Sequence, residues 1–320
     1  MRLRRVLAAG ALALAATAAA AADVYPPVKA RLVPVQVAAH TWYVQGDPGV
    51  ASAANEGFNS NAGFVVTDDG VVVVDALGSP SLGAELLAAI RGITPKPVRR
   101  VIVTHYHADH FYGLKPFKDA GADVWAHRGA LDYLASDEAK RRHEQRARDL
   151  SPWVSAGTPL VPADHWLDGD EAFTLGGVRF DIQHFGPAHS PEDLVVVVPG
   201  EGVVFSGDIL FTGRVPYVGQ ADSKAWLARI GRLIDLGPKV MVTGHGAVSR
   251  DPGKDLALTR DYLTFLRAEM GRAVADFVPF EEAYRRTDWR RYASLPAFEA
   301  ANRVNAYGTY LLMEKESLAK

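Results

Sequence analysis

The segment Val101-Ile-Val-Thr-His-Tyr-His-Ala-Asp-His110 constrains the fold of this chain more than any other stretch. An apolar, mostly β-branched run ends in three histidines and one aspartate, which is the pattern of a buried strand that delivers polar side chains at its end. His105 and His107 are two positions apart, so an extended backbone points both the same way and they can bind one ion. Asp109 and His110 follow where the chain turns into a helix, and the turn can direct them to a second ion. Imidazole and carboxylate ligands without thiolate suit zinc, and also iron or manganese.

Three further segments place a ligand-type residue beside an apolar strand. His189 lies in a turn-rich loop before the run 194–198, Asp208 lies within the run 203–211, and His245 ends the run 240–245. In kind and order, these residues and the His/Asp segment resemble the ligands of the metallo-β-lactamase-fold hydrolases. That superfamily includes glyoxalase II, lactonases and the zinc lactamases, and the resemblance covers roughly residues 37–249.

The resemblance implies a site that holds two Zn²⁺ ions per chain. It assigns His105, His107 and His189 to the first ion, Asp109, His110 and His245 to the second, and Asp208 to both. Two cations that share a water lower its pKa to near neutrality, so a metal-bridging hydroxide attacks the substrate without a Ser or Cys nucleophile. Asp109 is also expected to act in catalysis, by orienting the nucleophile or moving its proton. Asp75 would support the histidines rather than bind metal.

Strand and helix signals predict an α/β fold. A hairpin over 63–75, a helix over 81–90 and the strand from Val101 form a βαβ unit, which needs a right-handed crossover and a sheet covered by helices. The resemblance makes this a four-layer αβ/βα metallo-β-lactamase sandwich. Residues 23–250 would form this domain. Helical patterns over 254–270, 280–286 and 295–318 predict a C-terminal helical extension, 251–320, packed on the domain.

The N-terminus has the features of a secretory signal peptide over residues 1–22. Met1-Arg-Leu-Arg-Arg5 is positively charged, and the Ala/Leu-rich run that follows is shorter than the ~20 residues of a membrane-spanning helix. We therefore expect a periplasmic or secreted bacterial protein that is not attached to the membrane after cleavage. The chain has no cysteine, so no disulfides are expected.

Composition limits the partners of the chain. With 320 residues, 48% hydrophobic content and a formal charge of −2, it can bury a large core and offers no electrostatic case for nucleic-acid binding. The expected partner is a small-molecule substrate, and the oligomeric state is left open.

Several segments outside the motifs also carry expectations. The charged segment 128–150 is typical of a solvated helix. The Pro-rich, aromatic segment 151–166 is expected to form a loop over the active site. Tyr112 is expected to pack rather than line the pocket. The remaining histidines are expected to be surface or core residues, namely His40, His127, His143, His165 and His184.

The expected substrate is inferred from positions at which this sequence differs from members of the family that it resembles. Zinc β-lactamases have Cys or Ser where Asp208 stands, which argues against an efficient lactamase, and lactonases have Tyr where Phe211 stands. The segment 206–211 is more similar to glyoxalase II, but export argues against a cytosolic glutathione thioester. The exported SoxH-like group, associated with sulfur oxidation or quinoprotein dehydrogenase systems, fits best, so we expect cleavage of an ester, thioester or lactone-type acyl bond.

Three alternatives remain open at this point. One is a β-lactam hydrolase. Another is an iron-dependent sulfur oxidoreductase, which His107 disfavours because flavodiiron-type members have Glu there. The third is a non-catalytic periplasmic metal-binding accessory protein.

Overall fold

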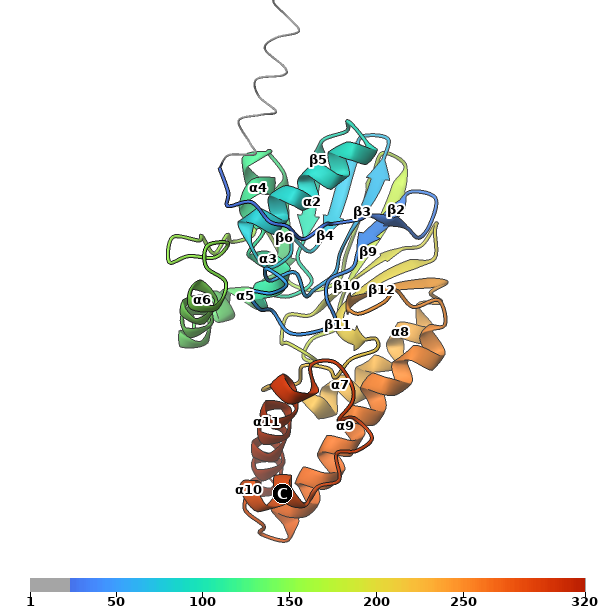
Figure 1. Ribbon diagram of the computed structural model, residues 1–320. Coiled ribbons are helices and arrows are strands. Elements are labelled where there is room, and N and C mark those ends of the chain that lie inside the picture. Colours follow the sequence, from blue (N-terminus) through green and yellow to red (C-terminus); the bar gives the residue numbers. More distant parts are fainter. Residues whose placement is uncertain (1–23, 320) are drawn as a thin grey trace, which may run out of the picture.

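The computed structural model describes residues 24–319, so the expected signal peptide at 1–22 lies outside the described residues (Figure 1). Two β-sheets face each other and helices cover their outer faces. This arrangement confirms the predicted α/β class and the four-layer sandwich. Within residues 24–319, no helix is long and apolar enough to cross a membrane.

The first sheet has seven strands in sequence order, β1 to β7. It consists of β1 (Val35–Gln36), β2 (Thr41–Val44), β3 (Ala62–Thr67), β4 (Gly70–Val74), β5 (Val98–Ile102), β6 (Asp123–His127) and β7 (His165–Leu167). The strands from β1 to β4 pair antiparallel, and those from β4 to β7 pair parallel. The carboxyl ends of parallel strands share one edge of a sheet, so Asp75 after β4 and the His/Asp segment after β5 come together there.

The second sheet has five strands in the order β12-β11-β10-β9-β8. It consists of β8 (Glu171–Leu175), β9 (Val178–His184), β10 (Leu194–Val198), β11 (Val203–Phe211) and β12 (Val240–His245). All nine residues of β11 are buried, including the polar Ser206 and Asp208, which stand between two apolar stretches of the strand. The register between β11 and β12 shifts on both sides of Gly207, so the strand is irregular where Asp208 leaves it.

Buried apolar side chains form three clusters, one at each interface of the four layers. Val65 and Val196 belong to the cluster between the two sheets. Leu86 of α2 (Pro80–Ile93) and Phe117 of α4 (Leu114–Asp119) belong to the cluster outside the first sheet. The cluster outside the second sheet includes Trp226 of α7 (Ser223–Ile230). Each such side chain is worth about 1.5–3 kcal/mol relative to exposure, so these interfaces dominate the stability of the fold.

The C-terminal helices pack against the second sheet and against each other. After the short α8 (Arg232–Asp235), they are α9 (Pro252–Ala275), α10 (Phe280–Arg286) and α11 (Phe298–Leu318), and these three agree with the predicted helical extension. Asn305 of α11 accepts backbone N–H bonds from Val218 and Gly219 at 2.8 and 3.2 Å. A Cβ on Gly308 would lie 1.7 Å from the carbonyl oxygen of Gly219, so only glycine allows this approach. The contact brings α11 over the loop 216–222, next to the sheet edge.

Two expectations for residues 128–166 need correction. The charged segment forms two helices, α5 (Ala130–Leu134) and α6 (Asp137–Asp149), because Ser136 caps α6 by accepting a bond from Ala139 N. The prediction of a loop over the active site at 151–166 is wrong. Val154 and Val161 are buried in the cluster outside the first sheet, so the apolar residues of this segment serve packing instead.

Candidate metal centre

The edge of the first sheet places four of the expected ligands. After β5 ends at Ile102, a short loop carries His105 and His107, and α3 (Ala108–Phe111) carries Asp109 and His110 in its single turn. Tyr112, just after α3, is fully buried, as expected. The loop and the short helix thus supply four of the seven expected ligands.

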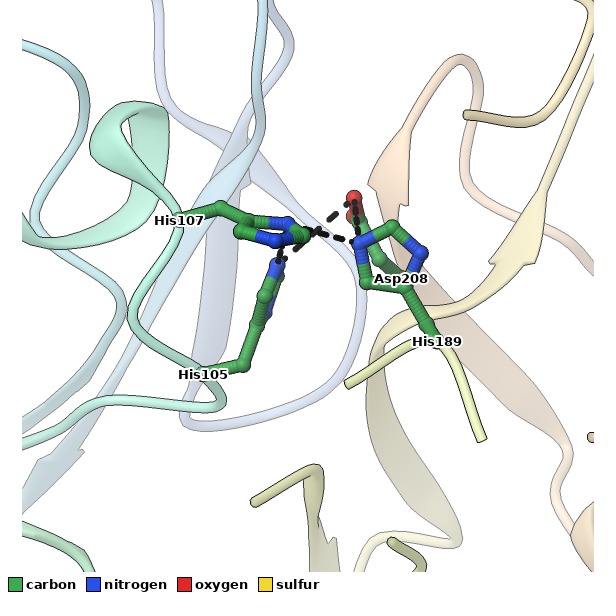
Figure 2. Close-up of side chains that lie close together, drawn as sticks. All are labelled: His105, His107, His189 and Asp208. Atoms are coloured by element: carbon green, nitrogen blue, oxygen red, sulfur yellow. Dashed lines mark hydrogen bonds and ion pairs between the residues drawn. The ribbon is translucent and has the colours of Figure 1, made fainter. Parts of the chain in front are cut away.

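Three histidines and one aspartate converge in the first ligand group. The ligand atoms of His105, His107, His189 and Asp208 all lie within 4.8 Å of one another. Nδ1 of His107 lies 3.1 Å from Nε2 of His105 and 2.8 Å from Nε2 of His189. Figure 2 shows the two histidines of the first sheet edge meeting His189, from the loop between β9 and β10, and Asp208 of β11. Ring nitrogens that converge in this way are arranged as ligands around a cation.

The second group consists of Asp109, His110 and His245. Nε2 of His245 lies 3.4 Å from Oδ2 of Asp109 and 3.3 Å from Oδ2 of Asp208. Nε2 of His110 lies 3.4 Å from the other oxygen, Oδ1, of Asp208. The Asp208 carboxylate therefore contacts both groups, the position that the resemblance gives to a bridging ligand.

Buried polar atoms at the centre lack partners that a metal ion would supply. Nε2 of His110 and Oδ1 of Asp208 are buried without a hydrogen-bond partner in the part of the chain that the structure describes. An unsatisfied buried polar group costs about 1–3 kcal/mol, and more if it is charged. Nitrogen and oxygen ligands without sulfur suit zinc in a catalytic site. The residues present therefore fit two divalent metal ions.

Asp75 orients the histidines by hydrogen bonds. Its Oδ2 accepts a bond from His110 Nδ1 at 2.9 Å, and its Oδ1 accepts one from Thr104 N at 2.8 Å. The Thr104 hydroxyl donates to Asp75 at 2.9 Å and lies 3.0 Å from Nδ1 of His105. These contacts turn Nε2 of both histidines toward the centre. His245 is fixed in the same manner, because its Nδ1 donates to the carbonyl oxygen of Asn59 at 2.7 Å.

Burial and charge set the protonation of the metal-free centre. Burial lowers the pKa of His107 to about 3 and that of His189 to about 4, so both are neutral and can donate a lone pair. Burial also favours the neutral form of His110, but the negative charges of Asp208 and Asp75 raise its pKa to about 10. A proton on His110 therefore competes with a metal ion.

Two local structures hold His189 and Asp208 in place. Asp193 accepts bonds from the backbone N and the hydroxyl of Ser190, both at 2.8 Å, which closes the turn that carries His189. Gly244 lies against the bridging carboxylate, and a Cβ there would be 1.9 Å from Oδ1 of Asp208. A larger residue at position 244 would force either the carboxylate or the backbone of β12 to move.

Two cavities open at the centre. One, the arginine-lined cavity, has a volume of about 540 Å³ and reaches His107, Asp109, Asp208 and His245. Its remaining wall includes Arg142 and Arg146 of α6, Arg214, Tyr217, and Ala301 and Val304 of α11. The other, the aromatic-lined cavity, measures about 520 Å³ and lies beside His107 and His189. Tyr133, Tyr217 and, on α11, Val304, Tyr307 and Leu311 line it, and residues 151–166 line neither cavity.

Sequence reasoning missed the residues of these walls. The expectation of a solvated face for 128–150 is wrong for one side of α6, where Arg142, Gln145, Arg146 and Asp149 line a cavity. Their spacing of three and four residues is the one signal that could have indicated a shared face. Tyr217 and Arg214 lie in a loop without periodicity, which gives no such signal.

The other histidines lie away from the centre, as expected. His127 stacks on His184 with ring centroids 3.9 Å apart, and His165 bonds to Glu171 at 3.0 Å. His143 bonds to the carbonyl oxygen of Thr158 at 2.9 Å. His40 is 59% exposed and contacts Glu201 at 2.8 Å. Within residues 24–319, none of these five belongs to a group that could hold a metal ion.

Comparisons with known proteins identify the family to which the sequence is similar. The family model of the metallo-beta-lactamase superfamily matches residues 55–245. A linear primary-alkylsulfatase of Pseudomonas sp. is 24% identical over 246 residues, which cover 65% of this chain and 46% of the relative. The chain thus spans about half the length of that relative. A probable metallo-hydrolase of Bacillus subtilis is 26% identical over 65% of this chain and 92% of its own length.

Among solved structures, a stereoselective inverting sec-alkylsulfatase from Pseudomonas sp. is similar with a TM-score of 0.64 and 18% identity. The similarity covers 88% of this chain and 50% of the sulfatase. At this level of identity, the similarity concerns the fold.

Proposed function

Because this chain belongs to the metallo-β-lactamase superfamily, we propose that it is a dinuclear zinc hydrolase that cleaves an ester, thioester or lactone-type acyl bond. The observation that carries the proposal is the position of Asp208. Its two oxygens lie 3.3 to 3.4 Å from nitrogens of His189, His245 and His110, which come from both ligand groups. A carboxylate at this point can bind both ions and offset their mutual repulsion.

Each group of residues has a distinct part in the proposed site. The first ion would be held by His105, His107 and His189, the second by Asp109, His110 and His245, and both by Asp208. Bound there, the ions would lower the pKa of a shared water to near neutrality and polarise the bond under attack. No Ser or Cys nucleophile is then required.

In this proposal, Asp109 accepts a proton and Tyr217 donates a hydrogen bond to the leaving group. Oδ2 of Asp109 accepts a bond from Asn59 Nδ2 at 2.8 Å and lies 3.4 Å from Nε2 of His245, so the carboxylate is held within the ligand groups, where a metal-bound water would come within its reach. Burial alone would raise the pKa of Asp109, but the positive charges of His110, His245 and Arg146 outweigh burial and lower it. The ionised carboxylate can accept a proton. Tyr217 lines both cavities, and its hydroxyl, which accepts a long bond from Arg142, would be free to donate a hydrogen bond to the departing oxygen or sulfur.

Asp208 also bears on the choice between an acyl ester and a β-lactam. Its negative charge reduces the positive field at the centre, and departure of an amide nitrogen requires more stabilisation than departure of an activated alcohol or thiol. We expect kcat/KM for an activated aryl ester or thioester to exceed that for a cephalosporin by at least about tenfold.

One preparation tests the proposal in two measurements. Elemental analysis of the purified protein should give two zinc ions per chain, and one iron without zinc would contradict the dinuclear zinc site. The same zinc-loaded protein is then assayed with aryl esters, thioesters, lactones and a cephalosporin. Faster turnover of the β-lactam than of every ester would refute the acyl-ester assignment, and no turnover of any activated substrate would favour a metal-binding accessory protein.

A second candidate, hydrolysis of a sulfate ester, is favoured by the sequence similarity to a linear primary-alkylsulfatase and by the arginines beside the centre. Release of 4-nitrophenol from 4-nitrophenyl sulfate, compared with the aryl esters on the same preparation, distinguishes the two.

We also propose that the protein acts after export, on the basis of the charged and apolar residues 1–22. N-terminal sequencing of the protein from a periplasmic extract tests this proposal. A mature protein that begins near Asp23 supports export, and an intact Met1 in the cytosolic fraction contradicts it.

A further inference from the structure

We propose that Arg142 and Arg146 of α6 bind a carboxylate of the substrate that does not itself react, beside the metal centre. The inference rests on the proposed hydrolase function, since it names the substrate class as acyl esters that carry a second, anionic carboxylate. The two arginines, not the metal ligands, would then select among esters.

The two arginines share a face of α6 and a cavity with the metal centre. They are four residues apart, so their side chains are neighbours on the helix surface. Both line the arginine-lined cavity, which also contains Asp109 and Asp208. Arg141 and Arg148 are exposed, lie on another side of the same helix and line neither cavity. The positive charge on the inner side of α6 is therefore directed into the space in front of the metal ligands.

Neither guanidinium forms an ion pair with a carboxylate in the described residues, although both arginines lie near enough to Asp109 for their charges to interact with it. Arg142 contacts the Tyr217 hydroxyl at 3.4 Å and Gln145 Oε1 at 3.3 Å, both long for a hydrogen bond. Across residues 24–319, no carboxylate forms an ion pair with Arg142 or Arg146, whereas Arg291 pairs with Asp261 at 2.7 Å. Both side chains are partly buried, where an unpaired charge is costly. An anionic ligand in the cavity would supply the missing counter-charge.

The chemistry of the guanidinium group indicates which kind of anion would bind. A planar guanidinium presents its N–H groups in a fork that matches the two oxygens of a carboxylate. Among residues 24–319, Arg142 makes only these two long contacts and the Arg146 side chain makes no hydrogen bond, so most of their N–H donors remain available. Arg214 differs because it is buried and donates to the carbonyl oxygens of Gly49 at 2.8 Å and Val215 at 3.4 Å. It supports the wall beside His245 rather than presenting a free fork.

A matched pair of esters tests the inference. 4-Nitrophenyl hydrogen adipate and 4-nitrophenyl hexanoate have the same leaving group and the same acyl length, and differ by a terminal carboxylate. The zinc-loaded wild type should prefer the adipate by about tenfold in kcat/KM, chiefly through KM, and added salt should reduce this preference. In the Arg142→Gln/Arg146→Gln variant, the ratio should fall to about one. The control Arg141→Gln/Arg148→Gln should keep the wild-type ratio.

A binding measurement separates this inference from the hydrolase proposal. Calorimetric titration of zinc-loaded protein with adipate should give at least tenfold weaker binding for the double glutamine variant than for the wild type. The charge-conserving Arg142→Lys/Arg146→Lys variant should retain part of the affinity, which excludes misfolding as the cause. If no ester is cleaved but adipate binding depends on the arginines, the hydrolase proposal fails and the anion site stands.

Three results would overturn the inference. They are equal or better turnover of the neutral hexanoate by the wild type, adipate binding that is unchanged in the double glutamine variant, and arginine-dependent cleavage of 4-nitrophenyl sulfate in preference to both esters. In the last case, the arginines would hold the reacting group itself.

Discussion

Nδ1 of His110 donates a hydrogen bond to the carboxylate of Asp75 at 2.9 Å, and this contact fixes which ring nitrogen faces the metal centre. With Nδ1 held, Nε2 is directed at Asp208, 3.4 Å away. A histidine that binds metal through one nitrogen is commonly oriented through the other, which also raises its basicity as a ligand.

We predict that Asp75→Asn weakens binding of the second metal ion by about 10- to 100-fold, because the amide cannot accept from His110 and Thr104 as the carboxylate does. Competition with a chromophoric chelator measures the affinity. Asp68→Asn, whose carboxylate is 92% exposed on the β3–β4 turn, serves as control and should bind like wild type. Equal affinity in the two variants would contradict an orienting role for Asp75.

We predict that Asp208→Ala loses the second metal ion and most of the activity, since its carboxylate lies against nitrogens of both ligand groups. Zinc content per chain and turnover of an activated ester are measured together. Asp235→Ala, at an exposed position of α8, is the control. A variant that keeps both ions and near-normal turnover would show that Asp208 does not bridge them.

We predict that Gly244→Ala disturbs the metal centre although position 244 offers no ligand. Its Cβ would lie 1.9 Å from Oδ1 of Asp208, so either the carboxylate or the backbone of β12 has to move. We expect at least tenfold lower affinity for one of the two ions. Gly92→Ala, where a Cβ meets nothing within 4 Å, is the matched control. Wild-type zinc binding by Gly244→Ala would mean that the strand relaxes without cost.

The ligand set could be predicted from sequence because its signals are local. Four ligands lie within six residues after one apolar strand. Asp208 lies within a second strand, and His245 ends a third. The cavity walls could not be predicted in this way. Arg142 lines the cavity only because α6 packs beside the sheet edge, and Val304 only because Asn305 fixes α11 to the backbone of Val218 and Gly219.

The incorrect expectation for residues 151–166 has a related cause. Proline and aromatic residues indicate a loop but not the side of the protein on which it packs. Trp153 donates to the carbonyl oxygen of Pro27 at 3.0 Å, a contact between segments far apart in sequence. A long-range contact of this kind leaves no pattern within the segment itself.

We predict that the metal-free protein is most stable near pH 6.5. His110 has a folded-state pKa of about 10, above its usual 6.5, so its contribution is complete below pH 6.5 and is lost as the pH rises to 10. The pKa values of His107 and His189 are lowered to about 3 and 4, so their contribution is present above pH 6.5 and is lost as the pH falls. Thermal midpoints from pH 5 to 9.5 should therefore fall on both sides of the maximum.

The metal-loaded protein and His110→Ala provide the comparison for this pH profile. Neither has the His110 proton, so the loss of stability on the alkaline side should be absent from both. An alkaline decline of the same size with and without zinc would assign the effect to other groups.

The metal ligands are divided between the two sheets. His105 to His110 follow β5 of the first sheet, whereas His189 precedes β10, and Asp208 and His245 lie in β11 and β12 of the second. Bound ions would therefore act as cross-links between the two halves of the sandwich, joining positions as far apart as 105 and 245. The halves could not separate until the ions dissociate. Resistance to proteolysis should then follow the rate of metal release, and a chelator would act as a slow denaturant of an otherwise durable protein.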